Sequence, residues 1–211
     1  MRRRSGALGL PGTTPAAGGG MLTPMAGNRR DRRATYQDLL AADERLVAEI
    51  LNGELHTSPR PAPRHALAAS ALGGTLDAPF RRARGGPGGW LILDEPEIHL
   101  GEDVVVPDLA GWRRERMPAL PPEPYFPLAP DWACEVLSPA TRQIDRLKKL
   151  PLYARERVTH VWLVDPDAQT VEVLRLESGR WVLVTVAGAE ERVRLEPFAE
   201  VEIDLAGLWA E

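Results

Sequence analysis

The sequence contains very little cysteine and no long apolar run. With one cysteine, Cys134, among 211 residues, the chain can form no internal disulfide and no zinc site built on several cysteines. We therefore expect a cytoplasmic protein and interpret Cys134 as a small core residue. No stretch approaches the roughly 18 uninterrupted apolar residues of a membrane span, so we expect no membrane partner.

Basic charge is scarce beyond the first 33 residues. Of the 26 Lys and Arg residues, seven arginines lie within residues 1–33, which contain one of the 30 Asp and Glu residues. Residues 34–211 therefore carry 19 basic and 29 acidic side chains, a formal net charge of −10. Because so acidic a body would not coat nucleic acid non-specifically, any contact with nucleic acid must be local.

The first 33 residues also differ in composition from the rest. They are rich in Gly, Pro and Arg and show no apolar periodicity, which is typical of disorder. We predict a disordered tail over residues 1–33 and a single domain over residues 34–211, a length that can bury a substantial core.

Apolar periodicity and turn residues predict an α/β (α+β) protein in which helices flank one mixed β-sheet. Strands buried on both faces read as continuous apolar runs, whereas the last hairpin alternates. The predicted order is a short helix, a hairpin turning at Asn52-Gly53, a helix, two strands, a proline-rich loop, a strand, a helix, a strand and a final hairpin, over residues 35–44, 45–58, 62–82, 90–100, 102–112, 117–130, 131–137, 146–156, 160–166 and 170–188.

Two of the predicted strands contain a carboxylate. Glu135 interrupts the apolar run "ACEVL", and Asp108 interrupts "VVVPDLAGW". A buried carboxylate needs a cation, a donor network or a metal ion. Since side chains alternate along a strand, Val104, Val106 and Asp108 would share one face, and two facing carboxylates would favour a hard divalent ion such as magnesium or manganese.

Other partners for these carboxylates are open on this evidence. Glu135 could pair with Arg142 or Arg146, and Asp108 could cap a loop. Alternatively, Lys148 or Lys149 could reach the same strand end and position a metal-bound water.

The segments "TYQDLLA", "EILNGEL", "VVVPDLA", "CEVLSPAT", "DRLKKLPLYARERVTHVWLVDP" and "TVEVLRLESGRWV" resemble the Uma-two family of endonucleases. This family is part of the PD-(D/E)XK nuclease superfamily, and the resemblance runs from about Thr35 to the C-terminus. Leu137 stands where the superfamily usually places its lysine. In the Uma-two family this lysine lies in the following helix, which points to Lys149.

The resemblance implies a restriction-endonuclease-like fold and hydrolysis of DNA phosphodiester bonds. It implies that Asp108, Glu135 and the Val136 carbonyl hold magnesium or manganese. It also implies that Lys149 positions the attacking water while Glu49 supports the metal or the water.

Several further interpretations follow from local sequence. We expect a helix to start near Lys148, which would place Pro151 in its first turn. His65 opens a helix and either faces the cleft or makes a local hydrogen bond, and Tyr153 fits core packing. The arginine runs at residues 81–84 and 113–116 fit solvated faces better than phosphate contacts.

Two other classes of protein are compatible with the sequence. The missing lysine at Leu137 and the acidic body also suit a catalytically silent nuclease-fold module that binds nucleic acid or a protein partner. The strand-rich C-terminal half would suit a structural homo-oligomer.

Overall fold

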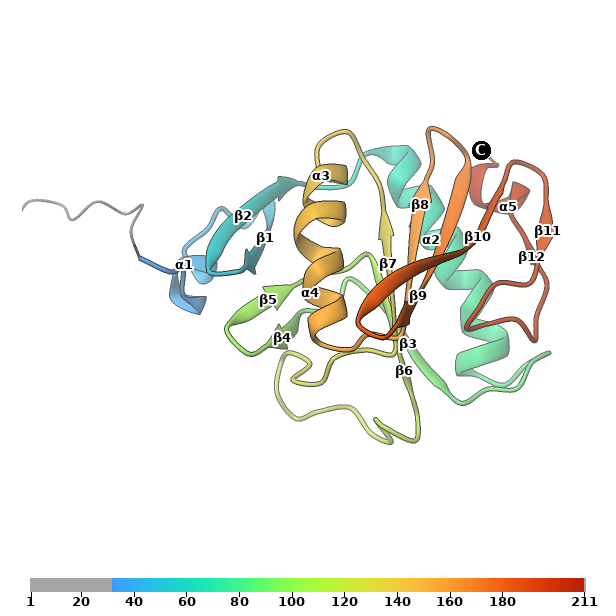
Figure 1. The fold of residues 1–211 in the computed structure, drawn as a ribbon, viewed down its shortest axis with the longest axis horizontal. Helices are drawn as coiled ribbons and strands as arrows, with labels where there is room; N and C mark the ends of the chain where they lie inside the picture. The colour runs from blue at the N-terminus through green and yellow to red at the C-terminus, as the bar shows by residue number, and fades with distance from the viewer. Residues whose placement is uncertain (1–31, 211) are drawn as a thin grey trace, which may run out of the picture. The chain divides into compact units, whose positions relative to one another are not determined.

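The structure is a computed structural model that describes residues 32–210 (Figure 1). The predicted tail over residues 1–33 lies almost wholly outside this range. Its disorder, and the division of the chain into a tail and one domain, therefore stay predictions. Within residues 32–210 no helix is long and apolar enough to cross a membrane.

The N-terminal elements follow the expected order. Helix α1 (Tyr36–Leu40) precedes the antiparallel hairpin of β1 (Leu46–Leu51) and β2 (Glu54–Pro59). Asn52 and Gly53 both have positive φ angles, 56° and 80°, as the two central residues of a type I′ turn require. The predicted hairpin and its turn are confirmed.

Helix α2 (Pro63–Leu76) confirms the helix predicted over residues 62–82, and it continues as the π-helical turn η1 (Asp77–Arg81). Pro63 lies in the first turn, where its missing N–H costs no hydrogen bond. Ala68, Leu72 and Leu76 recur at a spacing of four residues and are fully buried, so α2 packs one apolar face onto the sheet.

The strands predicted over residues 90–100 and 102–112 are both broken in the structure. They form four strands, β3 (Trp90–Asp94), β4 (Ile98–Leu100), β5 (Asp103–Val105) and β6 (Leu109–Arg113). Each break contains a proline, Pro96 or Pro107, which has no N–H to donate to a sheet. The inference that Val104, Val106 and Asp108 share the face of one strand is therefore wrong, because Asp108 lies in the break between β5 and β6.

The breaks divide the strands between two sheets. One sheet has the order β2-β1-β5-β4 and is antiparallel. The other has the order β10-β9-β8-β7-β6-β3, in which β7 and β8 run parallel and the other pairs antiparallel. The mixed sheet is thus confirmed, and the four-stranded sheet was not foreseen. The remaining strands of the larger sheet are β7 (Trp132–Val136), β8 (His160–Asp165), β9 (Thr170–Glu177) and β10 (Arg180–Gly188).

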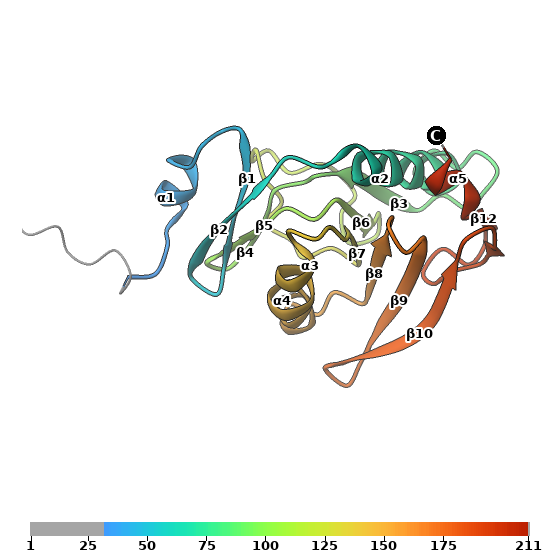
Figure 2. The same cartoon turned by 90° about the horizontal axis from the view of Figure 1, so that it is seen from above.

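The C-terminal residues add a small antiparallel pair of β11 (Arg192–Val193) and β12 (Ile203–Asp204) and the short helix α5 (Ala206–Trp209). Helix α5 packs beside α2 on the same face of the larger sheet, and the segment of α3 and α4 lies on the opposite face (Figure 2).

The helix expected to start near Lys148 starts earlier. The chain is helical from α3 (Arg142–Ile144) through the π-helical turn η2 (Asp145–Lys149) into α4 (Leu150–Arg155). The start near Lys148 is wrong, and Pro151 lies inside a continuous helical segment. The π-helical turn, with its hydrogen bond from the Leu150 N–H to the Asp145 carbonyl, ends directly before Pro151, which cannot donate the usual helical hydrogen bond.

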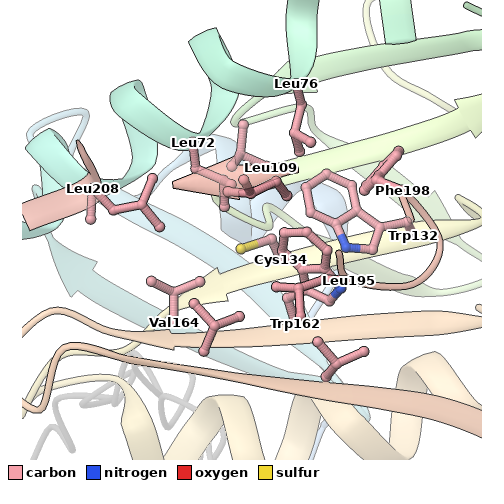
Figure 3. Close-up of a cluster of buried hydrophobic side chains, with 14 of the residues drawn as sticks. Leu72, Leu76, Leu109, Trp132, Cys134, Trp162, Val164, Leu195, Phe198 and Leu208 are labelled. Carbon is pink, nitrogen blue, oxygen red and sulfur yellow. The ribbon is translucent and has the colours of Figure 1, made fainter. Parts of the chain in front are cut away.

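Alternate residues of β7 face different layers of the core. Trp132, Cys134 and Val136 pack with α2 and with the C-terminal segment around Phe198 (Figure 3). Cys134 is fully buried there, as its interpretation as a small core residue requires. Ala133 belongs instead to the cluster that contains Tyr153 of α4. Because side chains alternate along a strand, Glu135 points toward η2 and α4.

Candidate functional site

A cavity of about 250 Å³ lies where the two sheets, α2 and η2 meet. Its floor contains acidic groups from four separate segments. Its walls come from the β2–α2 link and from the loop after β7. The lining comprises Val47, Glu49, residues 58–62, His65, Glu95, Val106, Asp108, Glu135, residues 138–141, Asp145 and Lys149.

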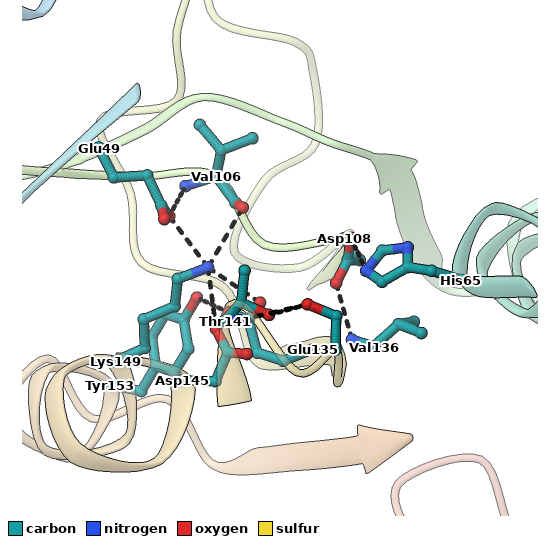
Figure 4. Close-up of polar contacts among 11 residues, drawn as sticks. Glu49, His65, Val106, Asp108, Glu135, Val136, Thr141, Asp145, Lys149 and Tyr153 are labelled. Carbon is teal, nitrogen blue, oxygen red and sulfur yellow. Dashed lines mark hydrogen bonds and ion pairs between the residues drawn. The ribbon is translucent and has the colours of Figure 1, made fainter. Parts of the chain in front are cut away.

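The ammonium group of Lys149 is the centre of the polar contacts (Figure 4). Its Nζ lies 3.0 Å from Glu135 Oε2 and 3.0 Å from Glu49 Oε1. Asp145 Oδ1 is 3.6 Å away, one helical turn before the lysine. The lysine is 5% exposed, so these carboxylates replace the water that would otherwise solvate its charge.

Glu135 of β7 is held by Lys149 and by a phenol. The hydroxyl of Tyr153 donates to Glu135 Oε1 at 2.6 Å, and Glu135 itself is 2% exposed. The alternative partners lie elsewhere, because Arg142 faces Asp165 and Arg146 pairs with Glu172. The alternative of an arginine partner is therefore wrong.

Asp108 lies immediately before β6, and the pairing of Leu109 with Cys134 places it opposite Glu135. Its Oδ2 accepts a hydrogen bond from the Val136 N–H at 2.7 Å. Its Oδ1 lies 3.2 Å from Nε2 of His65, at the start of α2. Asp108 and Glu135 thus border the same cavity. His65 also lines this cavity, so it faces the cleft, which is one of the two alternatives that the sequence left open.

Glu49 on β1 reaches the site from the smaller sheet. Its Oε1 accepts the Val106 N–H at 2.8 Å as well as contacting Lys149. Glu49 is 5% exposed, so it is not the exposed hairpin residue that its position near a turn could suggest. Lys148 points elsewhere, toward Glu54 at 3.1 Å.

Sequence reasoning missed Asp145 and the polar role of Tyr153. Asp145, Lys149 and Tyr153 follow one another at intervals of four residues, so they share one side of the helical segment and face β7 together. That spacing was visible in the sequence. The hydroxyl of Tyr153 was not assigned because its ring belongs to the core, where it is fully buried.

The arginine runs do not enter the site. Arg81 and Arg82 pair with Asp77, and the guanidinium of Arg113 lies 4.4 Å from the ring centre of Trp90. Their interpretation as surface groups agrees with these contacts.

Burial and like charge control the protonation of the cluster. Burial raises the pKa of Glu135 well above its usual value; Asp145, Asp108 and Glu49 add to the shift and Lys149 opposes it. For Lys149, burial acts to lower the pKa, but Glu135 and Glu49 outweigh it and the pKa is raised. The surrounding carboxylates raise both pKa values, whereas burial adds to the shift of Glu135 and opposes that of Lys149.

His65 responds to the same excess of negative charge. Burial acts to lower its pKa, but the hydrogen bond and charge of Asp108 outweigh burial, so the pKa is raised. A cationic imidazole beside Asp108 would offset part of the charge on that carboxylate.

The donors at this site are of the kind that a hard divalent cation takes. Three carboxylates contact the ammonium group of Lys149 and a fourth, that of Asp108, borders the same cavity, which leaves the cluster with excess negative charge. Among residues 32–210, however, no three His, Cys, Asp or Glu side chains are already arranged to hold a metal ion. The reason is local, since Asp108 is turned to His65 and the Val136 N–H, and Glu135 to Tyr153 and Lys149.

A mixed sheet flanked by helices, with acidic residues gathered at a strand break, defines a restriction-endonuclease-like protein. Within that class the chain belongs to the Uma2 family, whose model, described as "Putative restriction endonuclease", matches residues 33–206. The resemblance drawn from the sequence motifs is thereby confirmed.

A solved structure shows a similar fold. It is a protein from Anabaena variabilis described as a putative nuclease belonging to DUF820, with a TM-score of 0.67 and 23% sequence identity over 83% of this chain and 97% of that chain. At this identity the likeness supports the fold alone. No curated protein matches the chain.

Proposed function

We propose that the protein is a metal-dependent endonuclease that hydrolyses phosphodiester bonds in DNA. The observation that carries this proposal is a single cavity in which three carboxylates contact the buried Lys149 and a fourth, that of Asp108, lines the same space. Burying that much like charge is costly for stability. The arrangement is therefore better explained by chemistry than by folding, and the family description gives the reaction type.

The metal ligands in this proposal are Asp108, Glu135 and the carbonyl of Val136, and the ion is magnesium or manganese. When bound, the ion supplies Lewis acidity, which lowers the pKa of a water and neutralises charge on the phosphate. Each oxygen of Glu135 accepts one hydrogen bond, from Lys149 or from Tyr153, and keeps a second lone pair for the ion.

In this proposal the remaining residues position the attacking water and hold the side chains around it. Lys149 orients the attacking water and stabilises negative charge that develops on the phosphate. Glu49 holds the lysine in place through its 3.0 Å contact. Asp145 and Tyr153 fix the lysine and Glu135 from the helical side.

The experiment is cleavage of supercoiled plasmid and of labelled oligonucleotides with magnesium, manganese or chelator. We expect nicking that needs the divalent ion and disappears in Asp108→Ala. A matched control is Asp165→Ala, a carboxylate at the end of β8 that does not line the cavity. Equal activity of wild type and Asp108→Ala would show that the cavity is not the active site.

One observation favours a second function, that of a catalytically silent module which binds nucleic acid or a protein partner. Lys149 and Glu135 already satisfy one another, and no ready metal cluster exists among the described residues. For a silent module, calorimetry would detect no binding of magnesium or manganese by the wild type. Binding that is lost in Asp108→Ala would favour the enzyme.

A further inference from the structure

The groups that would act on a phosphate lie deep in the protein. Glu135 and Asp145 are each 2% exposed, and Glu49 and Lys149 are each 5% exposed. The cavity above them, about 250 Å³, lies below the ~300–1,000 Å³ typical of sites for drug-sized ligands. A phosphodiester must therefore enter the cavity to reach Lys149, because the lysine does not project to the surface.

The walls of the cavity are short and stiff. One wall runs from Ser58 to Ala62, from the end of β2 to the residue before α2, and includes Pro59 and Pro61; another is the loop of residues 138–141, which begins Ser138-Pro139. Proline fixes the φ angle of each segment, so the walls resist wide opening. Enzymes that act on a base in a recessed pocket take single strands or draw the nucleotide out of the duplex, and a recessed site for a phosphodiester sets a similar steric limit.

The charge of residues 34–211 points the same way. Proteins that hold a long duplex neutralise many phosphates and usually show a basic stripe. Residues 34–211 instead carry a formal net charge of −10. Besides Lys149 and His65, Arg60 is the one basic side chain in the described lining of the cavity.

The charge of Arg60 is not neutralised within residues 32–210. Its guanidinium donates to the backbone carbonyl of Glu44 at 3.2 Å, and no described carboxylate forms an ion pair with it. Arg146 and Arg155, on the neighbouring helical segment, are both paired with carboxylates. Arg60 is therefore available to an anion at the mouth of the cavity, above the acidic floor.

We propose that the cavity accepts a single nucleic-acid strand or a locally unpaired segment, not an intact duplex, and that Arg60 contacts a phosphate of that strand at the rim. This inference rests on the proposed function. The contact orients the backbone so that the next phosphodiester reaches Lys149. The duplex is excluded because its paired partner strand cannot follow between the two walls.

The first test compares three labelled DNAs of the same sequence: a single strand, its duplex, and a duplex with one splayed end. Binding is followed by fluorescence anisotropy with calcium in place of magnesium, and cleavage with manganese. We expect at least tenfold tighter binding of the single strand than of the duplex, and cuts confined to the unpaired arm of the splayed DNA.

The outcomes separate the two proposals. Equal or tighter binding of the duplex, or cutting within its paired region, overturns the single-strand inference and leaves a nuclease intact. Absence of both binding and cleavage for all three DNAs overturns the proposed function and this inference together.

The second test examines Arg60. Arg60→Gln should weaken single-strand binding and raise KM while kcat changes little, and the slope of log affinity against log salt should fall by about 0.7 for one lost phosphate contact. Arg64→Gln is the matched control, since Arg64 is exposed, four residues away and lines a different cavity. Equal behaviour of the two variants overturns the assignment of Arg60.

Discussion

Glu135 is tolerated inside a strand because the helical segment of η2 and α4 brings it two polar partners. Lys149 supplies the charge and Tyr153 a hydrogen bond, while Asp108 adds repulsion across β6 and β7. Because carboxylates outnumber cations around it, Glu135 contributes little to the free energy of unfolding. A residue held in this way is expected to matter for ligand binding more than for folding.

The first prediction at this scale concerns the charge of Glu135. Glu135→Gln keeps the shape and removes one buried negative charge, so the thermal midpoint should stay the same or rise. Manganese affinity measured by calorimetry should fall at least ~10-fold, because a charged ligand is lost. If the variant unfolds and the wild type binds no divalent ion, Glu135 serves only as a structural partner of Lys149.

The second prediction separates two adjacent lysines. Lys149→Ala leaves Glu135 and Glu49 without their buried cation, which should cost ~3–5 kcal/mol of stability in chelator, and manganese should restore much of it. Cleavage should fall ~10²–10³-fold through the loss of charge stabilisation. Lys148→Ala is the control, and both properties should remain near wild type because its partner Glu54 is exposed.

A larger effect of Lys148→Ala than of Lys149→Ala on cleavage would place the active lysine one residue earlier. Chemical denaturation in chelator and in manganese, with matched ionic strength, measures the stability part of the prediction.

At the scale of elements, the strand breaks at Pro96 and Pro107 create the site. Strands β3 and β6 pair in the larger sheet, whereas β4 and β5, which lie between them in the sequence, pair in the smaller sheet. The chain therefore crosses between the sheets at each break, and Asp108 lies in the second break. Both prolines are visible in the sequence, but the apolar pattern continues on each side of them and therefore predicts unbroken strands. Pairing of β5 with β1, through Ile50 and Val104, joins residues far apart in the sequence, and no local pattern specifies it.

The third prediction uses two neighbouring glycines of α2. A β-carbon at Gly74 would meet nothing within 4 Å, whereas one at Gly73 would lie 3.2 Å from the buried Leu109 and 2.8 Å from Asp94. Gly74→Ala should therefore stabilise the protein by up to ~1 kcal/mol, or ~2–4 °C in thermal midpoint. Gly73→Ala should gain less or lose stability. Calorimetric melts of the two variants check the ranking, and a higher midpoint for Gly73→Ala would contradict it.

At the scale of the whole molecule, residues 1–31 offer a prediction from composition. Their Gly, Pro and Arg content cannot offset an ordering cost of ~1–2 kcal/mol per residue. Deleting them should change the thermal midpoint by less than ~2 °C, below the effect of 1 kcal/mol in a chain of this size. A drop of many degrees would show that these residues belong to the folded domain. Location in the cytoplasm and assembly into a homo-oligomer also stay predictions.

The sequence by itself determined the mixed sheet with flanking helices, the turn at Asn52-Gly53 and the family, because these rest on local backbone chemistry and on ordered motifs. It also brought Asp108, Glu135, Glu49 and Lys149 forward as one group of candidates. Their roles stay proposals.

Tertiary structure alone decided which charges meet. It chose Lys149 over Lys148 and over the arginines as the partner of Glu135, brought His65 to Asp108, and added Asp145 and Tyr153. The physical reason is that the energy of a buried charge depends on distances of a few ångströms between groups from separate elements. Those distances are fixed only when the two sheets and the helices pack together.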